Sequence, residues 1–254
     1  MKPILFNTEM VRALLEGRKT VTRRVVKPQP KGAHDVIDYD DEEHTADLLC
    51  GNNGEGNAFL DWAETVKAPF WTGDILYVRE TFRIDYLSNI PGAGRVQYKD
   101  GTYMDIRFTP ERYDMMRQAQ RKPGWRPNEN MPREAARIFL RVTDVRVERL
   151  QEIDGLEAFD EGAVAPMPKG CLPPQKPDGY DDWSERKKND WLHSMARATY
   201  ISKLEFQERL IKAFRNIWDS TIKPKDLAAY GWDANPFVWV IEFERITKEE
   251  AEKE

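Results

Sequence analysis

Apolar residues recur at helical spacing close to the N-terminus. In the sequence FNTEMVRALLEG, residues 6–17, the apolar stripe consists of Met10, Val11, Leu14 and Leu15. Asn7 or Thr8 can cap such a helix, and Gly17 suits the position just after its last turn. The pattern predicts a short helix that ends immediately before a run of basic residues.

Three later segments show the alternation that is typical of strands. Residues 73–82 (GDILYVRETF) alternate after a Gly-Asp turn, and residues 235–246 (NPFVWVIEFERI) are dominated by β-branched and aromatic residues. In residues 136–150 (ARIFLRVTDVRVERL), one predicted face carries Ile138, Leu140 and Val142. A hairpin is also expected around the sequence KDG at residues 99–101.

Two more helices are predicted in the second half of the chain. Asp154 can cap a short helix that Gly162 closes. The second predicted helix, LEFQERLIKAFRNIW, covers residues 204–218, and its apolar stripe consists of Leu210, Ile211, Phe214, Ile217 and Trp218.

Polar segments rich in Gly and Pro separate these elements, and they favour loop or hairpin insertions near residues 31–68, 85–130 and 164–200. Strands mixed with a few helices indicate the α+β class, with a small antiparallel or mixed barrel. The sequence therefore predicts a single domain, residues 1–254, with flanking helices and long insertions.

Composition narrows the possible roles. With 40% hydrophobic residues in 254, the chain can bury a sizeable core. We expect a cytoplasmic protein with no membrane association, because no signal peptide and no apolar run long enough for a bilayer appear. Cys50 and Cys171 lie in predicted loops without metal-ligand spacing, which favours two free thiols.

Neither a metal nor a cofactor is expected. The histidines lie in polar insertions without matching ligand spacing, and no Walker or dinucleotide-binding motif appears. The three histidines are His34, His44 and His193.

The basic run LEGRKTVTRR, residues 15–24, is the most unusual local feature. The chain carries a net charge of −5, so any contact with nucleic acid must come from a local basic patch. This run gathers Arg18, Lys19, Arg23 and Arg24 around two threonines. A plainer interpretation is that Arg18 and Lys19 only complement the partial negative charge at the helix end.

The run resembles the signature of the ASCH domain family, Gly-x-Lys-x-x-Thr-x-Arg at the end of the first helix. Gly17, Lys19, Thr22 and Arg24 fill its positions. The Gly-Asp strand, the central strand, a short helix ending in Glu-Gly and the closing strand follow in the family's order. The likeness covers the core without the insertions, and the chain is similar to the longer ASCH proteins often found in phages and prophages. It implies a PUA-like β-barrel whose neighbouring cleft binds RNA or a modified nucleoside.

The resemblance also implies a catalytic constellation. Small bacterial ASCH proteins remove the acetyl group from N4-acetylcytidine with a Lys, a Thr and a Glu. At the matching positions, Thr22 is the expected nucleophile, Lys19 its base and Glu161 the acid, with Glu157 and Asp160 as alternatives to Glu161. Expected substrate-binding residues are Arg18, Arg23, Arg24, Arg79 and Glu80.

Structural roles compete with these assignments. Thr22 can bond to the backbone in a turn, Glu161 can be a solvated residue at a helix end, and Arg79 with Glu80 can form a structural pair. Trp71, Trp125 and Trp232 can either stack on a base or plug the core edge.

The rival functions are a non-catalytic RNA-binding or protein-interaction module of phage origin and a metal-independent ribonuclease. The sequence leaves the oligomeric state open.

Overall fold

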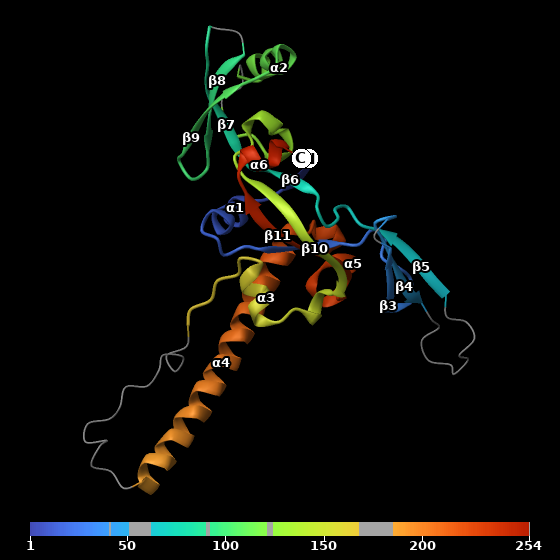
Figure 1. Cartoon of the computed structure of the whole chain (residues 1–254), viewed down its shortest axis with the longest axis vertical. Coiled ribbons are helices and arrows are strands. Elements are labelled where there is room, and N and C mark those ends of the chain that lie inside the picture. The colour runs from blue at the N-terminus through green and yellow to red at the C-terminus, as the bar shows by residue number, and fades with distance from the viewer. Residues whose placement is uncertain (41, 51–61, 90–91, 121–123, 168–184, 254) are drawn as a thin grey trace. The chain divides into compact units, whose positions relative to one another are not determined.

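The computed structural model describes residues 1–40, 42–50, 62–89, 92–120, 124–167 and 185–253. It confirms the α+β class (Figure 1). The chain forms two compact units. The first consists of Met1–Glu148 and Phe237–Glu254, and the second of Arg149–Pro236.

A five-stranded sheet forms the centre of the first unit, in the order β1-β6-β10-β11-β2. β1 runs parallel to β6, β10 antiparallel to β6, and β11 antiparallel to β2. The strands are β1 (Lys2–Leu5), β2 (Val21–Val25), β6 (Ile75–Arg79), β10 (Phe139–Arg149) and β11 (Phe237–Ile246). Within the described ranges the sheets do not close into a barrel, so only the coarser part of the fold prediction is confirmed.

The first predicted helix is present as α1 (Thr8–Leu15). The Asn7 side chain accepts a hydrogen bond from the Met10 amide at 2.9 Å, and Gly17 adopts a φ of 72° after the last turn. The amide of Arg18 donates to the Ala13 carbonyl at 2.9 Å. This left-handed cap turns the chain from α1 directly into β2, so the basic run begins at a fixed corner.

The main core combines residues of α1, the central sheet and the sheet formed by residues 33–67. Alternate residues of the strands face it, as the period-two pattern predicts. Its largest members include Ile4, Phe6, Leu14, Leu76, Leu140, Trp239 and Ile241, all nearly inaccessible to solvent.

The region from Lys27 to Ala68 contains a second, antiparallel sheet, so the hairpin alternative is the correct one there. Its strands are β3 (Ala33–Asp40), β4 (Thr45–Cys50) and β5 (Trp62–Lys67). Cys50 therefore ends a strand, in contrast to the predicted loop, whereas Cys171 lies outside the described residues.

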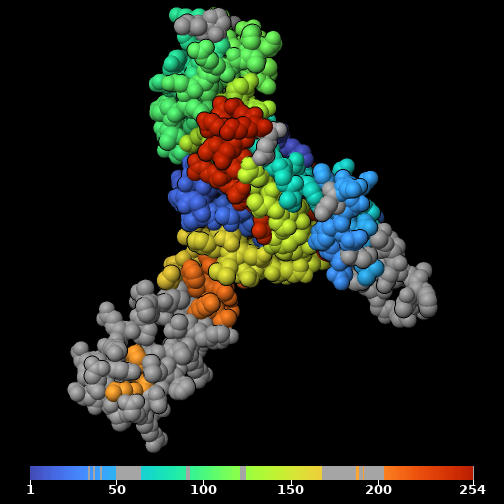
Figure 2. All heavy atoms as spheres, in the orientation of Figure 1, coloured from blue at the N-terminus to red at the C-terminus, as the bar shows by residue number. Residues whose placement is uncertain are grey.

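The insertion near residues 85–130 is also largely ordered. It includes most of an antiparallel sheet, in which Gly101 with a φ of 89° makes the predicted turn around KDG. The elements are β7 (Phe82–Leu87), β8 (Ala93–Tyr98), β9 (Tyr103–Arg107) and α2 (Pro110–Gln120). In the space-filling view these segments, coloured green, form one continuous surface (Figure 2).

A second core cluster holds α2 against this sheet. Tyr113 and Met116 of α2 are buried with Phe82, Val96 and Met131. The Tyr113 hydroxyl also donates to the Ser88 carbonyl at 2.5 Å. The chain then passes through the short 3-10 helices η1 (Asn128–Asn130) and η2 (Arg133–Ala135) into β10. The short helix α6 (Lys248–Lys253) follows β11.

The second unit is helical. Asp154 caps its first α-helix and accepts a hydrogen bond from the Glu157 amide at 2.8 Å, while Gly162, with a φ of 94°, follows the helix, as predicted. The predicted helix over residues 204–218 is longer than expected and begins at Glu185, inside the predicted insertion. The helices are η3 (Leu150–Glu152), α3 (Gly155–Asp160), α4 (Glu185–Thr221), η5 (Pro224–Asp226), α5 (Leu227–Tyr230) and η6 (Trp232–Ala234). Of the helices in the described ranges, none has the length and apolar character that a bilayer crossing needs.

Candidate functional site

Lys19 lies at the corner between α1 and β2, in the first unit. Lys19 is only 2% exposed to solvent. The ammonium donates to the Val21 carbonyl at 2.8 Å and lies 5.5 Å from the centre of the Phe6 ring. The carbonyl and the ring face both compensate a cation that has lost most of its water.

Thr22 and Arg24 lie on the same face of β2 because they are two positions apart in a strand. They pair across the sheet with Ile241 and Trp239, whose side chains belong to the main core. Thr22 is 1% exposed. The Arg24 guanidinium lies 5.2 Å from the centre of the Phe6 ring.

The strand alternation thus places Thr22 and Arg24 on one face of β2, and the contacts of Lys19 and Arg24 with the Phe6 ring bring Lys19 to the same side. We refer to Lys19, Thr22, Arg24 and Phe6 as the signature cluster. Arg24 also donates to the Leu5 carbonyl at 2.9 Å, which ties the cluster to the end of β1.

The other two predicted arginines of the run do not join this cluster. Arg23 points to the opposite face of β2, where its guanidinium pairs with Glu148 at 3.2 Å. Arg18 pairs with Glu16, with 2.8 Å between its Nε and the carboxylate. The three arginines expected to bind substrate therefore do not share one surface. Arg23 and Arg24 are adjacent in a strand and point to opposite faces, and Arg18 lies before the strand and pairs with Glu16.

Arg79 and Glu80 both have structural partners. Arg79 donates from Nε to the Met131 carbonyl at 2.9 Å and from Nη2 to the Glu129 carbonyl. Glu80 accepts two hydrogen bonds from Arg137, at 2.7 and 2.8 Å. Burial raises the pKa of Glu80, and the bonds from Arg137 oppose this shift. These contacts agree with the structural interpretation of the two residues.

Glu161 belongs to the second unit, where it is the C-terminal cap residue of α3 and is 5% exposed. The interpretation as a solvated residue is therefore wrong. Of its two alternatives, Glu157 closes the capping box of α3 by accepting from the Asp154 amide at 3.2 Å. A carboxylate that caps its own helix is a weaker candidate for a general acid. Glu161 therefore remains the preferred prediction over Glu157.

Comparison of the chain with family models, curated proteins and solved structures finds no match. The site is therefore interpreted from its own residues.

The three tryptophans differ in their environments. Trp71 is buried in the main core and stacks on His44, with ring centres 5.4 Å apart. Trp232 is half-buried beside Phe214. Only Trp125 of the three is well exposed, at 40%, and Lys99 lies 4.1 Å from its ring centre. Across the residues with described side chains, no group of three His, Cys, Asp or Glu is placed to hold a metal.

A cavity of about 520 Å³ in the first unit contains the predicted Arg79 and adds residues that the sequence did not suggest. Four arginines and one acid, Glu129, line it together with apolar side chains. We call it the arginine cavity, and its arginines are Arg79, Arg112, Arg126 and Arg133. A signal existed in the sequence, since residues 107–137 contain eight Lys or Arg and four Asp or Glu. That surplus did not show which of the cations share a wall.

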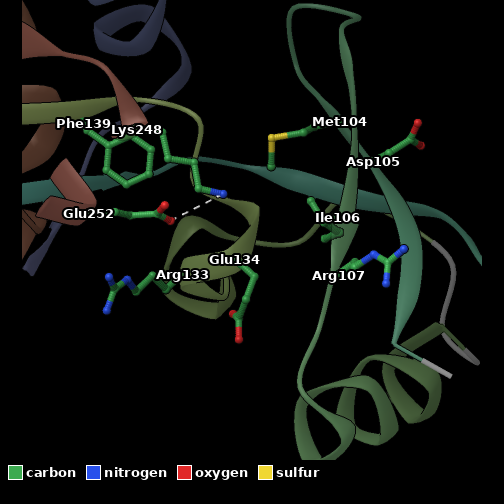
Figure 3. A pocket seen from close by; sticks show the side chains of 9 residues that line it. All are labelled: Met104, Asp105, Ile106, Arg107, Arg133, Glu134, Phe139, Lys248 and Glu252. Atoms are coloured by element: carbon green, nitrogen blue, oxygen red, sulfur yellow. Dashed lines mark ion pairs between the residues drawn. The ribbon is translucent and has the colours of Figure 1, made fainter. Parts of the chain in front are cut away.

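A second cavity of about 510 Å³ lies nearby in the same unit, with Arg133 shared between the two (Figure 3). Its charges are balanced. Figure 3 shows the Lys248 ammonium directed toward the Glu252 carboxylate, 3.8 Å away. The charged residues lining it are Asp105, Arg107, Arg133, Glu134, Lys248 and Glu252. With equal numbers of both signs, it offers no preference for an anion.

Proposed function

We propose that this protein acts on RNA or a modified nucleoside at the signature cluster, and that its reaction is hydrolysis of the amide of N4-acetylcytidine. The proposal includes a PUA-like arrangement for the core that carries β2. Its main support is that Lys19 and Arg24 both contact the Phe6 ring while Thr22 lies on the same strand face as Arg24. Burying the polar groups of Lys19 and Thr22 costs free energy, which supports a role for them beyond keeping the chain soluble.

The proposed reaction follows the residue types. The Thr22 hydroxyl attacks the acetyl carbon while Lys19, whose ammonium has first released a proton to solvent, takes the hydroxyl proton. The bond from the acetyl carbon to N4 then breaks, and N4 leaves as the amine of cytidine with a proton from Glu161. Water hydrolyses the resulting threonine ester to acetate. The role of Glu161, which lies in the second unit, rests on the sequence motif alone.

The test is incubation of the protein with N4-acetylcytidine as nucleoside, 5′-monophosphate and short RNA, with release of acetate and cytidine followed by mass spectrometry. Lys19→Met and Thr22→Val each keep the side chain's bulk but remove the base or the nucleophile. Each should lower turnover by a factor on the order of 10² or more. The double variant should be little worse than either single, because the two groups act as a unit.

Arg12→Ala is the matched control for these variants. Arg12 lies on α1 close to the cluster in sequence, but it is exposed and pairs with Glu9. This variant should keep full turnover. Full turnover in Thr22→Val would exclude the threonine ester and leave a water activated by Lys19, whereas cleavage of RNA without added metal would indicate a ribonuclease.

One observation favours a second candidate, a binding module without catalysis. Lys19 and Thr22 are 2% and 1% exposed, so a substrate reaches them only after neighbouring side chains move. A binding module would hold RNA equally well in wild type and Thr22→Val, with affinity that falls steeply as salt rises, and would release no acetate.

A further inference from the structure

We propose that the arginine cavity binds the phosphate group of a nucleotide or of RNA. The phosphate assignment stands on the cavity itself, and only the identity of the attached base rests on the proposed function. It favours a phosphorylated substrate over a free nucleoside.

The charge of the cavity wall favours an anionic ligand. Four guanidinium groups face one carboxylate, that of Glu129, in a chain that is acidic overall. Guanidinium groups bind phosphate oxygens through paired, charge-assisted hydrogen bonds, and they keep their charge at any physiological pH. Like charges gathered in one hollow repel each other, so an anion that enters it relieves that repulsion.

A second observation is the way the arginines are held. Arg79 donates to the backbone carbonyls of Met131 and Glu129, and Arg126 donates to the carbonyl of Ala119. These bonds hold both groups in place, and the two bonds of Arg79 use only part of the five N–H donors of its guanidinium. Preformed donors lose little conformational freedom when they bind a ligand.

Arg112 supplies the most available charge. It lies on α2, lines the cavity and is half-buried. Among the described residues, no side-chain acceptor bonds to its guanidinium. The fourth arginine, Arg133, is exposed, and its guanidinium contacts the Met1 sulfur at 3.1 Å, which is a weak acceptor that a phosphate oxygen can displace.

Apolar side chains on the same wall favour a nucleotide over a free inorganic anion. They are Tyr77, Met115, Met116, Met131 and Pro132. Met115 is 55% exposed, so its side chain is accessible for apolar contact with a ligand. The volume of about 520 Å³ is within the range of pockets that hold small organic ligands.

Hydrogen bonds at the end of β1 connect the signature cluster to β6, which carries Arg79 of the cavity wall. The Phe6 amide donates to the Arg79 carbonyl at 3.2 Å, and the Phe6 carbonyl accepts from the Asn128 side chain at 3.0 Å. Leu5, the preceding residue, accepts from Arg24. The end of β1 is therefore hydrogen-bonded both to the signature cluster, which we expect to bind the base, and to Arg79 of the arginine cavity, which we expect to bind the phosphate.

Calorimetric titration of the full chain with inorganic pyrophosphate, cytidine 5′-monophosphate, cytidine and O-phosphoserine tests this assignment. Arg112→Ala and Arg133→Ala should each weaken binding of pyrophosphate and of the monophosphate by about tenfold or more. Arg117→Ala is the matched control, because Arg117 is an exposed arginine of the same helix that does not line the cavity. Its affinities should match those of wild type.

The outcomes separate this proposal from the proposed function. If cytidine and its monophosphate bind equally, or if Arg112→Ala and Arg133→Ala bind pyrophosphate like wild type, the phosphate site is wrong, while deacetylation can still occur. If phosphate binding depends on Arg112 but no acetylcytidine is hydrolysed, the site stands and the enzymatic proposal fails. Binding of O-phosphoserine as tightly as cytidine 5′-monophosphate would overturn the nucleotide assignment in favour of a phosphopeptide.

Discussion

Three charged residues of the first unit, Lys19, Arg23 and Glu80, are at most 4% exposed. Each has a specific partner, respectively the Val21 carbonyl, Glu148 and Arg137. Burying a charge without such partners is costly, so these contacts are required for the fold as well as for any chemistry. Only the Lys19 contact belongs to the signature cluster.

Glu80→Gln should destabilise the protein by about 1–3 kcal/mol, because the amide has one oxygen to accept the two hydrogen bonds that Arg137 donates to the buried carboxyl group. The loss should depend on pH. Burial raises the pKa of Glu80 above its ordinary 4.5, so the stability from this group is full below that value and falls as pH rises through the higher pKa. The stability gap between wild type and variant should therefore be widest near pH 4 and narrow toward pH 7.

Urea unfolding at several pH values measures this gap. Glu249→Gln, a change at an exposed residue of α6, is the control and should stay within about 0.5 kcal/mol of wild type. A gap that widens as pH rises would show that the ion pair, not burial, dominates the titration of Glu80.

Among the elements, α3 approaches α4 most closely at Gly155. A Cβ added there would meet the Gln207 Cβ at 2.6 Å and its Cα at 2.7 Å. Gly155→Ala should therefore destabilise the second unit by about 1–3 kcal/mol, although the same change in an open helix stabilises it. Thermal unfolding measures the sign directly.

Leu156→Ala, at the 63% exposed neighbour, is the control for this change and should unfold close to the wild-type temperature. A higher melting temperature for Gly155→Ala would contradict the close approach of the two helices.

Local sequence signals predicted the elements well where one face is buried. The cap at Asn7, the turn at Gly17 and the alternation through Ile138, Leu140 and Val142 depend on neighbours along the chain, and the structure confirms them. The first turns of α4 lie in a polar segment and carry little amphipathic signal, so no local pattern predicts a helix from Glu185. The antiparallel sheet β3–β4–β5 was only an alternative, because its strands mix exposed and buried positions with Gly-rich connections.

For the molecule as a whole, the α+β class was predictable, whereas the composition of the site was only partly so. The signature motif predicted that Lys19, Thr22 and Arg24 act together. Which sheet face Arg23 and Arg24 each point to depends on how β2 pairs with β11, and the motif does not encode that pairing. The arginine cavity combines residues from β6, α2 and the segment that precedes β10. No local pattern encodes a wall built from such separate segments. The single-domain assignment and Glu161 as the acid stay predictions.

The central claim is that an RNA or a nucleotide binds to the protein at the signature cluster and the arginine cavity. Hydrogen–deuterium exchange of the full chain, with and without a short RNA containing N4-acetylcytidine, tests it most directly. The account predicts slower exchange in peptides covering residues 16–24 and 110–120 and 124–133 when the RNA is bound. Saturating RNA that slows exchange only in other segments would contradict it.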